Sequence, residues 1–178
     1  MQRKAEYFGS VNYGAGSETI MSSIREVFPQ ERDWTCSVAS IRTLLSGSKN
    51  CDIPTEDWFV STYKLEKGPY NSKQILDKGL VSSYDYKLGC TEPILEGNQL
   101  FKLTQLMKTH NVMIECLINY AHWIVLLGYV KLGTIEQDKF IYYDPYYHRI
   151  QTIIADELMS MWYDISGTMH RDYIAIAK

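Results

Sequence analysis

One stretch decides the fold of this 178-residue chain: Pro29-Gln-Glu-Arg-Asp-Trp-Thr-Cys36-Ser-Val-Ala-Ser-Ile-Arg-Thr-Leu-Leu45. Apolar residues recur at helical spacing from Cys36 onward and Gly47 follows as a stop, so we expect a helix that begins at Cys36. The free N–H groups and positive dipole end of a helix N-terminus stabilise a thiolate, which is the nucleophilic form of cysteine. A single cysteine is more often a small buried hydrophobic residue, so Cys36 alone does not establish a nucleophile.

Two further candidate residues lie at the ends of predicted strands. His122 begins the apolar strand His122–Val130, and Asp144 ends the strand Lys139–Asp144. If these strands pair through the intervening loop, both side chains fall at the same end of the hairpin. The aspartate would then hold one imidazole nitrogen while the other faces a thiol. The alternatives are a hydrogen-bonded core histidine, and an aspartate that merely starts a turn before Pro145.

Gln30 is the fourth candidate, because it precedes Cys36 by a short polar loop. A loop of this length can place the glutamine amide beside the backbone N–H of Cys36, and two such donors bind an oxyanion. A glutamine in a loop is usually only solvated. The hypothesis of an active site therefore rests on the order Gln, Cys, His, Asp, each at a plausible end of its element.

The remaining pattern predicts an α+β fold, with a helical N-terminal half packed on a mainly antiparallel C-terminal sheet. Residues 1–17 have no clear period, and we expect a flexible arm or loop there. The predicted helices are 17–28, 36–45, 55–64, 71–77, 98–110 and 155–163. The predicted strands are 112–118, 122–130, 139–144, 149–154 and 173–177.

The composition indicates the class of protein and argues against some classes of function. The chain is 46% hydrophobic and 22% charged, which is typical of a globular protein, and its length suits one domain over residues 1–178. A net charge of −3 gives no general footprint for nucleic acid or an anionic membrane. We find no membrane-spanning run and no secretory signal, and four scattered cysteines suit a reducing compartment, so we expect a cytoplasmic protein.

A metal site is a weaker interpretation of the cysteines and histidines than an active site. A zinc site would draw on Cys90, Cys116, His110 and His148, but the close ligand pairs of such sites are missing. We therefore expect no metal and no other cofactor. Cys51, Cys90 and Cys116 are interpreted as structural thiols. Four tyrosines cluster around Asp144, namely Tyr142, Tyr143, Tyr146 and Tyr147. Packing within the sheet is a more favoured explanation for them than stacking on a peptide substrate.

Taken together, these segments resemble the C39-type, papain-like cysteine peptidases. That family has Pro-Gln, a short polar stretch and then Cys-Gly-x-Ala opening a helix, which is similar to residues 29–45 here. His122–Tyr129 is similar to the family's His strand, and Phe140–Tyr146 to its Asp-Pro strand end. Ala155–Trp162 looks like its helix that ends in Trp. Ser37 departs from the usual glycine, which leaves the triad intact but alters the shape of the cleft.

The resemblance implies a papain-like fold and a cysteine peptidase that cleaves a peptide or isopeptide bond of a protein or peptide substrate. It makes Cys36 the nucleophile, His122 the general base and then acid, and Asp144 the residue that orients His122. The Gln30 side chain and the Cys36 amide would form the oxyanion hole. Without a membrane segment or a P-loop, the chain is expected to act as a free-standing enzyme.

Three alternatives remain beside hydrolysis. The same triad serves an acyltransferase or a deamidase, and a non-catalytic binding module could keep the fold without turnover. The Cys and His segments also look similar to the guanylyl-cyclase-like group, but no nucleotide-binding motif supports cyclase activity.

Overall fold

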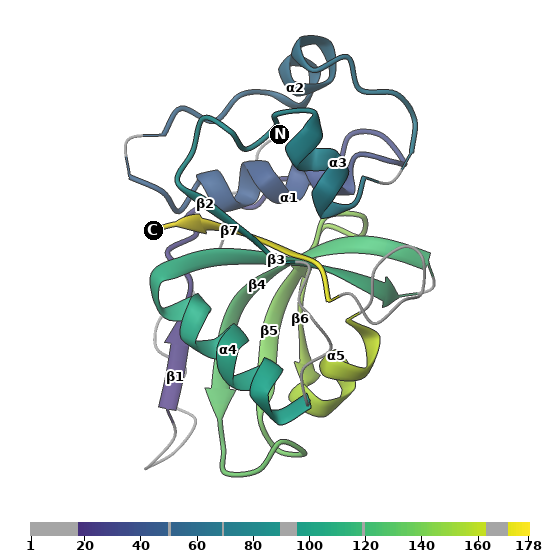
Figure 1. The fold of residues 1–178 in the computed structure, drawn as a ribbon. Coiled ribbons are helices and arrows are strands. Elements are labelled where there is room, and N and C mark those ends of the chain that lie inside the picture. Colours follow the sequence, from purple (N-terminus) through teal and green to yellow (C-terminus); the bar gives the residue numbers. More distant parts are fainter. Residues whose placement is uncertain (1–17, 50, 69, 90–95, 119, 163–170) are drawn as a thin grey trace.

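The computed structural model describes residues 18–49, 51–68, 70–89, 96–118, 120–162 and 171–178. Within them, strands and helices follow one another along the chain (Figure 1). The elements are β1 (Glu18–Met21), α1 (Cys36–Leu45), α2 (Glu56–Thr62), α3 (Ser72–Asp77), β2 (Tyr86–Gly89), α4 (Glu96–Thr109), β3 (His110–Ile118), β4 (Tyr120–Lys131), β5 (Lys139–Asp144), β6 (Arg149–Ile154), α5 (Ala155–Met161) and β7 (Tyr173–Ala177). The predicted arm over residues 1–17 lies outside the described residues, as does Cys90.

The strands form one sheet in the order β2-β7-β3-β4-β5-β6, and β1 also pairs with β4. Every pairing among the described strands is antiparallel. β4 and β5 form the predicted hairpin, with Leu126 opposite Tyr142 and Val130 opposite Lys139. The bounds of β5, β6 and β7 agree with the prediction. β4 begins two residues before the predicted start, so His122 is its third residue.

The N-terminal prediction of a helix over residues 17–28 is wrong, because Glu18–Met21 forms strand β1. β3 covers one edge of β4 only as far as Leu126, and β1 pairs with the edge beyond it, from Gly128 to Lys131. An unpaired strand edge offers backbone hydrogen bonds that outweigh a weak helical pattern. The short strand β2 was also not predicted, so the N-terminal half is not purely helical.

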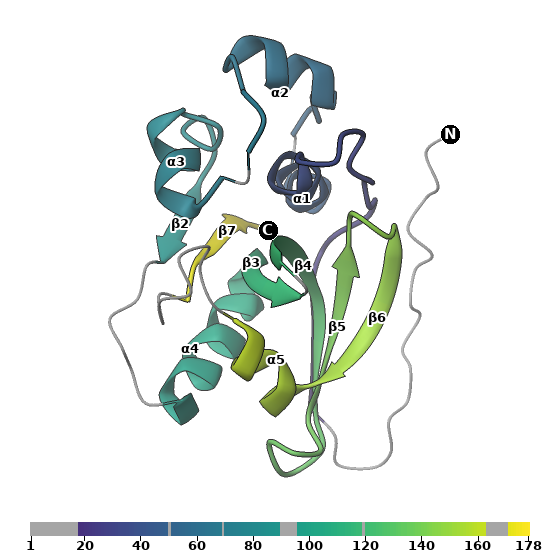
Figure 2. The same ribbon diagram turned by 90° about the vertical axis from the view of Figure 1, so that its right-hand side faces the viewer.

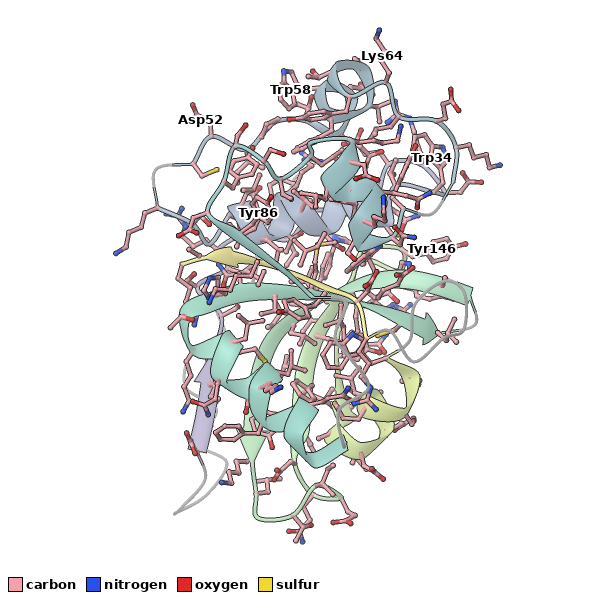
Figure 3. All side chains as sticks on the ribbon, viewed as in Figure 1. Trp34, Asp52, Trp58, Lys64, Tyr86 and Tyr146 are labelled. Atoms are coloured by element: carbon pink, nitrogen blue, oxygen red, sulfur yellow. The ribbon has the colours of Figure 1, made fainter. Side chains whose placement is uncertain are left out.

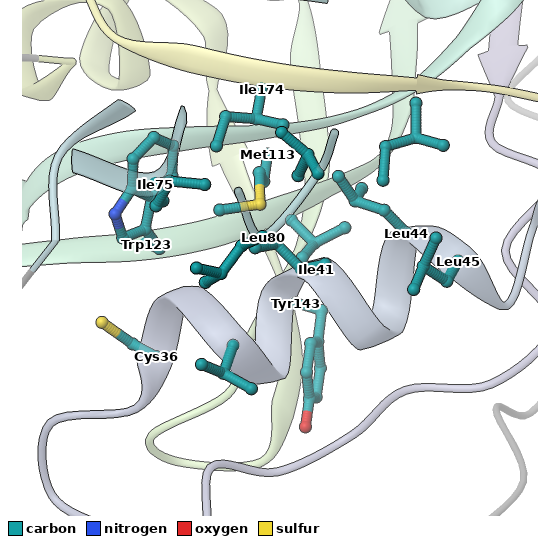
Figure 4. Close-up of a cluster of buried hydrophobic side chains, with 14 of the residues drawn as sticks. Cys36, Ile41, Leu44, Leu45, Ile75, Leu80, Met113, Trp123, Tyr143 and Ile174 are labelled. Carbon is teal, nitrogen blue, oxygen red and sulfur yellow. The ribbon is translucent and has the colours of Figure 1, made fainter. Parts of the chain in front are cut away.

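Helices cover both faces of the sheet (Figures 1 and 2). Beyond one face lie α1, α2 and α3, and their apolar side chains share one core with residues such as Met113, Trp123 and Ile174 (Figure 4). Against the other face lie α4 and α5, in a second core that contains Trp162. Each large apolar side chain buried in this way contributes about 1.5–3 kcal/mol.

The helices α2, α3, α4 and α5 follow the predicted segments with shifts of one or two residues at their ends. Asn71 caps α3 with a complete capping box, because its side chain accepts the Gln74 N–H while the Gln74 side chain accepts the Asn71 N–H. α5 ends at Met161, and the predicted end at Tyr163 lies outside the described residues. Within the described part of the chain, no helix has the length and apolar character needed to cross a membrane.

Candidate active site

Cys36 is the first residue of α1, as the sequence predicts, and its side chain is only 5% exposed. The apolar face of α1 fixes this position, since Val38, Ile41 and Leu44 are completely buried. Figure 4 shows the Cys36 sulfur at the start of the helix, on the side that faces Trp123. The N–H of a first helical residue has no partner within the helix and remains available to another acceptor.

His122 and Asp144 lie at the same end of the β4–β5 hairpin. The Nε2 atom of His122 is 2.7 Å from Oδ1 of Asp144, and the two side chains are 3% and 4% exposed. Burial lowers the pKa of His122, but the hydrogen bond with Asp144 and the interaction with the Cys36 thiol outweigh it, so the pKa rises to about 9. Both the Asp144 carboxylate and the thiol of α1 therefore favour the protonated imidazole.

The turn that follows Asp144 bonds to the same carboxylate oxygen as His122 does. The backbone N–H of Tyr146 donates to Oδ1 of Asp144 over 2.9 Å. Burial raises the pKa of Asp144, but the bond with His122 and the backbone N–H groups of Tyr146 and Tyr147 lower it more, and the net shift is downward. The carboxylate therefore stays charged and fixes the orientation of the ring.

Gln30 lies beside this turn. Its backbone N–H donates to the Pro145 carbonyl over 3.1 Å, and its side-chain Nε2 donates to the Arg32 carbonyl over 2.8 Å. The structure thus brings Gln30 next to the residue that follows Asp144, in the loop that leads into Cys36. The second hydrogen of the Gln30 amide remains for another acceptor.

Sequence reasoning missed Glu56, which lies at the start of α2 and is completely buried. Its carboxylate accepts hydrogen bonds from the Glu31 N–H, the Arg32 guanidinium and the Thr35 hydroxyl, all within the loop before Cys36. In the sequence Glu56 follows the helix cap Thr55 and looks like an ordinary acidic residue of a first helical turn. Only the fold places it under the loop.

Sequence reasoning also left open which tyrosines pack in the sheet. Tyr142 and Tyr143 do, since both are buried and their hydroxyls bond to Gln151 and His148. Tyr146 is 47% exposed, and its ring meets the His122 ring edge-on at 6.4 Å. Figure 3 shows Tyr146 and Trp34 on the same side of the molecule. An exposed aromatic ring therefore borders the candidate catalytic histidine.

The other cysteines have different surroundings. Cys116 pairs opposite His122 in the sheet but is completely buried, and burial raises its pKa well above the ordinary value. Cys51 is partly exposed, and burial followed by the charge of Asp52 raises its pKa. Ser37, which replaces the glycine of the family pattern, is buried, and its hydroxyl has no hydrogen-bond partner among the described residues.

The solved structures that share this architecture include two peptidase structures. UfSP from C. elegans superposes with a TM-score of 0.64 at 14% identity, over 99% of this chain and 37% of UfSP. The peptidase domain of Streptococcus ComA, a bi-functional ABC transporter involved in quorum sensing, superposes with a TM-score of 0.60 at 12% identity, over 85% of this chain and 98% of that domain. The fold is papain-like.

This likeness confirms the α+β, papain-like fold class predicted from the sequence, and at these identities it shows the fold alone. The chain spans about a third of the length of UfSP, against nearly all of the ComA peptidase domain. No known family model and no curated protein sequence matches the chain.

Proposed function

We propose that this chain is a papain-like, C39-like cysteine peptidase that hydrolyses a peptide or isopeptide bond through Cys36, His122 and Asp144. One observation carries the proposal: the buried His122 ring bonds to Asp144 at 2.7 Å and interacts with the Cys36 thiol at the start of α1. A core histidine needs one hydrogen-bond partner, whereas a ring held between a carboxylate and a helix-terminal thiol is the arrangement of an activated nucleophile. The substrate is accordingly a protein or a peptide.

In the first half of the reaction, the Cys36 sulfur gives its proton to His122 and attacks the carbonyl carbon of the scissile bond. A C–S bond forms and the carbonyl oxygen becomes an oxyanion, which the Cys36 N–H and the Gln30 amide stabilise by donating hydrogen bonds. As the intermediate collapses, the C–N bond breaks and His122 transfers its proton to the leaving amine nitrogen. Cys36 then holds the acyl group as a thioester.

In the second half, His122 takes a proton from water, and the hydroxyl oxygen attacks the thioester carbon. The C–S bond breaks, the carboxylic acid leaves, and the thiol–imidazole pair is restored. Asp144 stays ionised throughout and stabilises the imidazolium that forms in each half. Since His122 Nε2 is bonded to Asp144, the Nδ1 atom is the one that exchanges protons with the sulfur.

Alkylation by iodoacetamide tests the proposal, because exposure and activation predict opposite orders of reactivity. Cys51 is more exposed than Cys36, so simple access would make Cys51 react first. We expect Cys36 to be labelled at least about tenfold faster at neutral pH, since the thiolate is the reactive form. Peptide mapping by mass spectrometry would measure the rate at each cysteine.

The control is the variant His122→Ala, which should slow labelling of Cys36 and leave labelling of Cys51 unchanged. Equal labelling of the four cysteines in the native protein, or a His122→Ala variant that labels at the native rate, would contradict the proposal. Peptide cleavage gives a second test, because Cys36→Ala should abolish turnover of any peptide substrate that the native chain cleaves.

A further inference from the structure

The loop before Cys36 is bonded to a buried carboxylate, that of Glu56, which belongs to a different element from the candidate triad. Glu56 is 0% exposed, and its Oε2 atom accepts the Glu31 N–H over 3.0 Å. Its Oε1 atom accepts the Thr35 hydroxyl over 2.7 Å and the Arg32 guanidinium over 3.0 Å. Burying a carboxylate is costly unless donors and an opposite charge compensate it, and these three bonds supply both for Glu56.

These bonds continue to the groups assigned to the oxyanion hole. The Arg32 carbonyl accepts the Gln30 amide over 2.8 Å, and it lies 3.0 Å from the Thr35 hydroxyl, whose single hydrogen it shares with Glu56. Thr35 is the N-cap residue of α1 and directly precedes Cys36, but its hydroxyl bonds to the loop and to Glu56 rather than capping the helix. Glu56 is thus bonded to Arg32, which holds the Gln30 amide, and to Thr35, which precedes the first N–H of α1.

We infer that Glu56 is a positioning residue for oxyanion stabilisation, an inference that rests on the proposed function. It acts through Arg32 and Thr35 on Gln30 and on the Cys36 N–H, and it does not act on the thiol–imidazole pair. His122 and Asp144 come from β4 and β5 and share no bond with Glu56 among the described contacts. Loss of Glu56 should therefore separate two reactions of the same sulfur.

Two probes distinguish these reactions. Alkylation by iodoacetamide displaces iodide at a saturated carbon, so it needs the Cys36 thiolate but forms no oxyanion. Acylation by p-nitrophenyl acetate forms a C–S bond, passes through a tetrahedral oxyanion and releases p-nitrophenolate. The acylation rate at Cys36 is the release of p-nitrophenol minus that of the Cys36→Ala variant.

The test variant is Glu56→Gln, whose amide has a single acceptor oxygen, so it cannot accept from both the Glu31 N–H and the Arg32 guanidinium. We expect acylation to fall about tenfold, as a displaced oxyanion donor requires, while alkylation of Cys36 stays within about twofold of the native rate. In a Gln30→Ala background the same substitution should cost less than it does in the native chain, because one of the groups it positions is already gone.

Asp138→Asn is the matched control. Asp138 is also a buried carboxylate with three donors, namely the Tyr129 hydroxyl and the N–H groups of Leu132 and Gly133. It lies at the other end of the β4–β5 hairpin from His122 and Asp144, so its loss should change stability but neither reaction of Cys36. Thermal melting of both variants checks that each is folded. If Glu56→Gln does not fold, Thr35→Val removes the same hydroxyl bond and should give the same separation of the two rates.

The inference is overturned if Glu56→Gln acylates at the native rate, or if alkylation and acylation fall by the same factor, as a general loosening of the site would cause. An equal cost of the substitution in the native and Gln30→Ala chains overturns it as well. If the native chain itself is not acylated at Cys36, the proposed function fails and takes this inference with it. If the native chain is acylated at Cys36 and the Glu56→Gln variant is acylated at the same rate, the inference is refuted while the proposed function stands.

Discussion

The backbone N–H of Gln30 donates to the Pro145 carbonyl over 3.1 Å, which joins the loop before Cys36 to the turn after Asp144. The two segments are far apart in the sequence, and each carries part of the candidate site. This bond fixes the loop that carries Gln30 and leads into Cys36 relative to the His122–Asp144 pair. The helix and the hairpin therefore present their groups as one site.

Replacing Gln30 should separate oxyanion stabilisation from thiol activation. We expect Gln30→Ala to lower acylation of Cys36 by about a hundredfold or more, because one oxyanion donor is lost. Alkylation by iodoacetamide should stay close to the native rate, because the backbone bond to Pro145 is kept. The measurements are p-nitrophenol release and peptide mapping, and Gln105→Ala at an exposed position of α4 is the control. Unchanged acylation would remove Gln30 from the site.

The stability of the chain should depend on pH through His122. The pKa of His122 is about 9 in the folded chain, against about 6.5 in an unfolded one. A raised pKa gives stabilisation that is complete below about pH 6.5 and is lost as the pH rises through about 9, by up to about 3 kcal/mol. Asp144 has the opposite sign, because its lowered pKa gives stabilisation that is lost as the pH falls.

Thermal melting between pH 6 and pH 9 would check this dependence. The native chain should lose stability over that interval, whereas His122→Gln should lose much less, because it has no proton to release there. The same slope in both proteins would show that other groups cause it, and would count against the ion pair of His122.

Tyr146 should tune the histidine without holding the fold together. Its ring is 47% exposed and meets the His122 ring edge-on, so Tyr146→Ala should change the free energy of unfolding by less than about 1 kcal/mol. Removing the ring admits water and relieves the burial that lowers the pKa of His122, so that pKa should rise. An NMR titration of the His122 ring measures this.

Tyr147→Ala is the control for that variant, because Tyr147 is exposed to a similar degree and its ring packs on Tyr146. A His122 pKa that is the same in Tyr146→Ala as in the native chain would exclude the ring from any role at the site.

The sequence predicted those parts of the molecule in which local pattern and tertiary contacts agree. Cys36 opens α1, and Asp144 ends β5, because an apolar helical face and two apolar alternating strands leave few other arrangements. The hairpin register then follows, and with it the meeting of His122 and Asp144. The α+β, papain-like fold could be predicted on the same basis.

The rest depended on contacts that no local pattern encodes. β1 forms because β3 leaves the edge of β4 unpaired beyond Leu126, and the local sequence of residues 18–21 does not predict that pairing. Glu56 is similar, since a carboxylate in a first helical turn is normally solvated. Its burial under the loop before Cys36 follows from how α2 packs on α1, which is a property of the whole chain.

Gly47 shows a correct prediction with a different cause, and it gives the last test. The sequence predicts Gly47 as the stop of α1, and glycines that end helices commonly have a positive φ, but the described glycines with positive φ are Gly79 and Gly133. At Gly47 the constraint is space, because a Cβ there would lie 2.2 Å from Nδ2 of Asn111 and 2.9 Å from the backbone nitrogen of Ile24.

Gly47→Ala should therefore destabilise the chain. Asn111 is fully buried and bonds to Ser23, whose hydroxyl donates to the Gly47 carbonyl over 2.7 Å. A methyl group would push these partners apart and loosen the segment that follows β1, at a cost of about 1–3 kcal/mol. Gly68→Ala is the matched control, because no atom lies within 4 Å of its added Cβ. Chemical denaturation of both variants measures the difference, and equal stability would refute the close approach of the chain at Gly47.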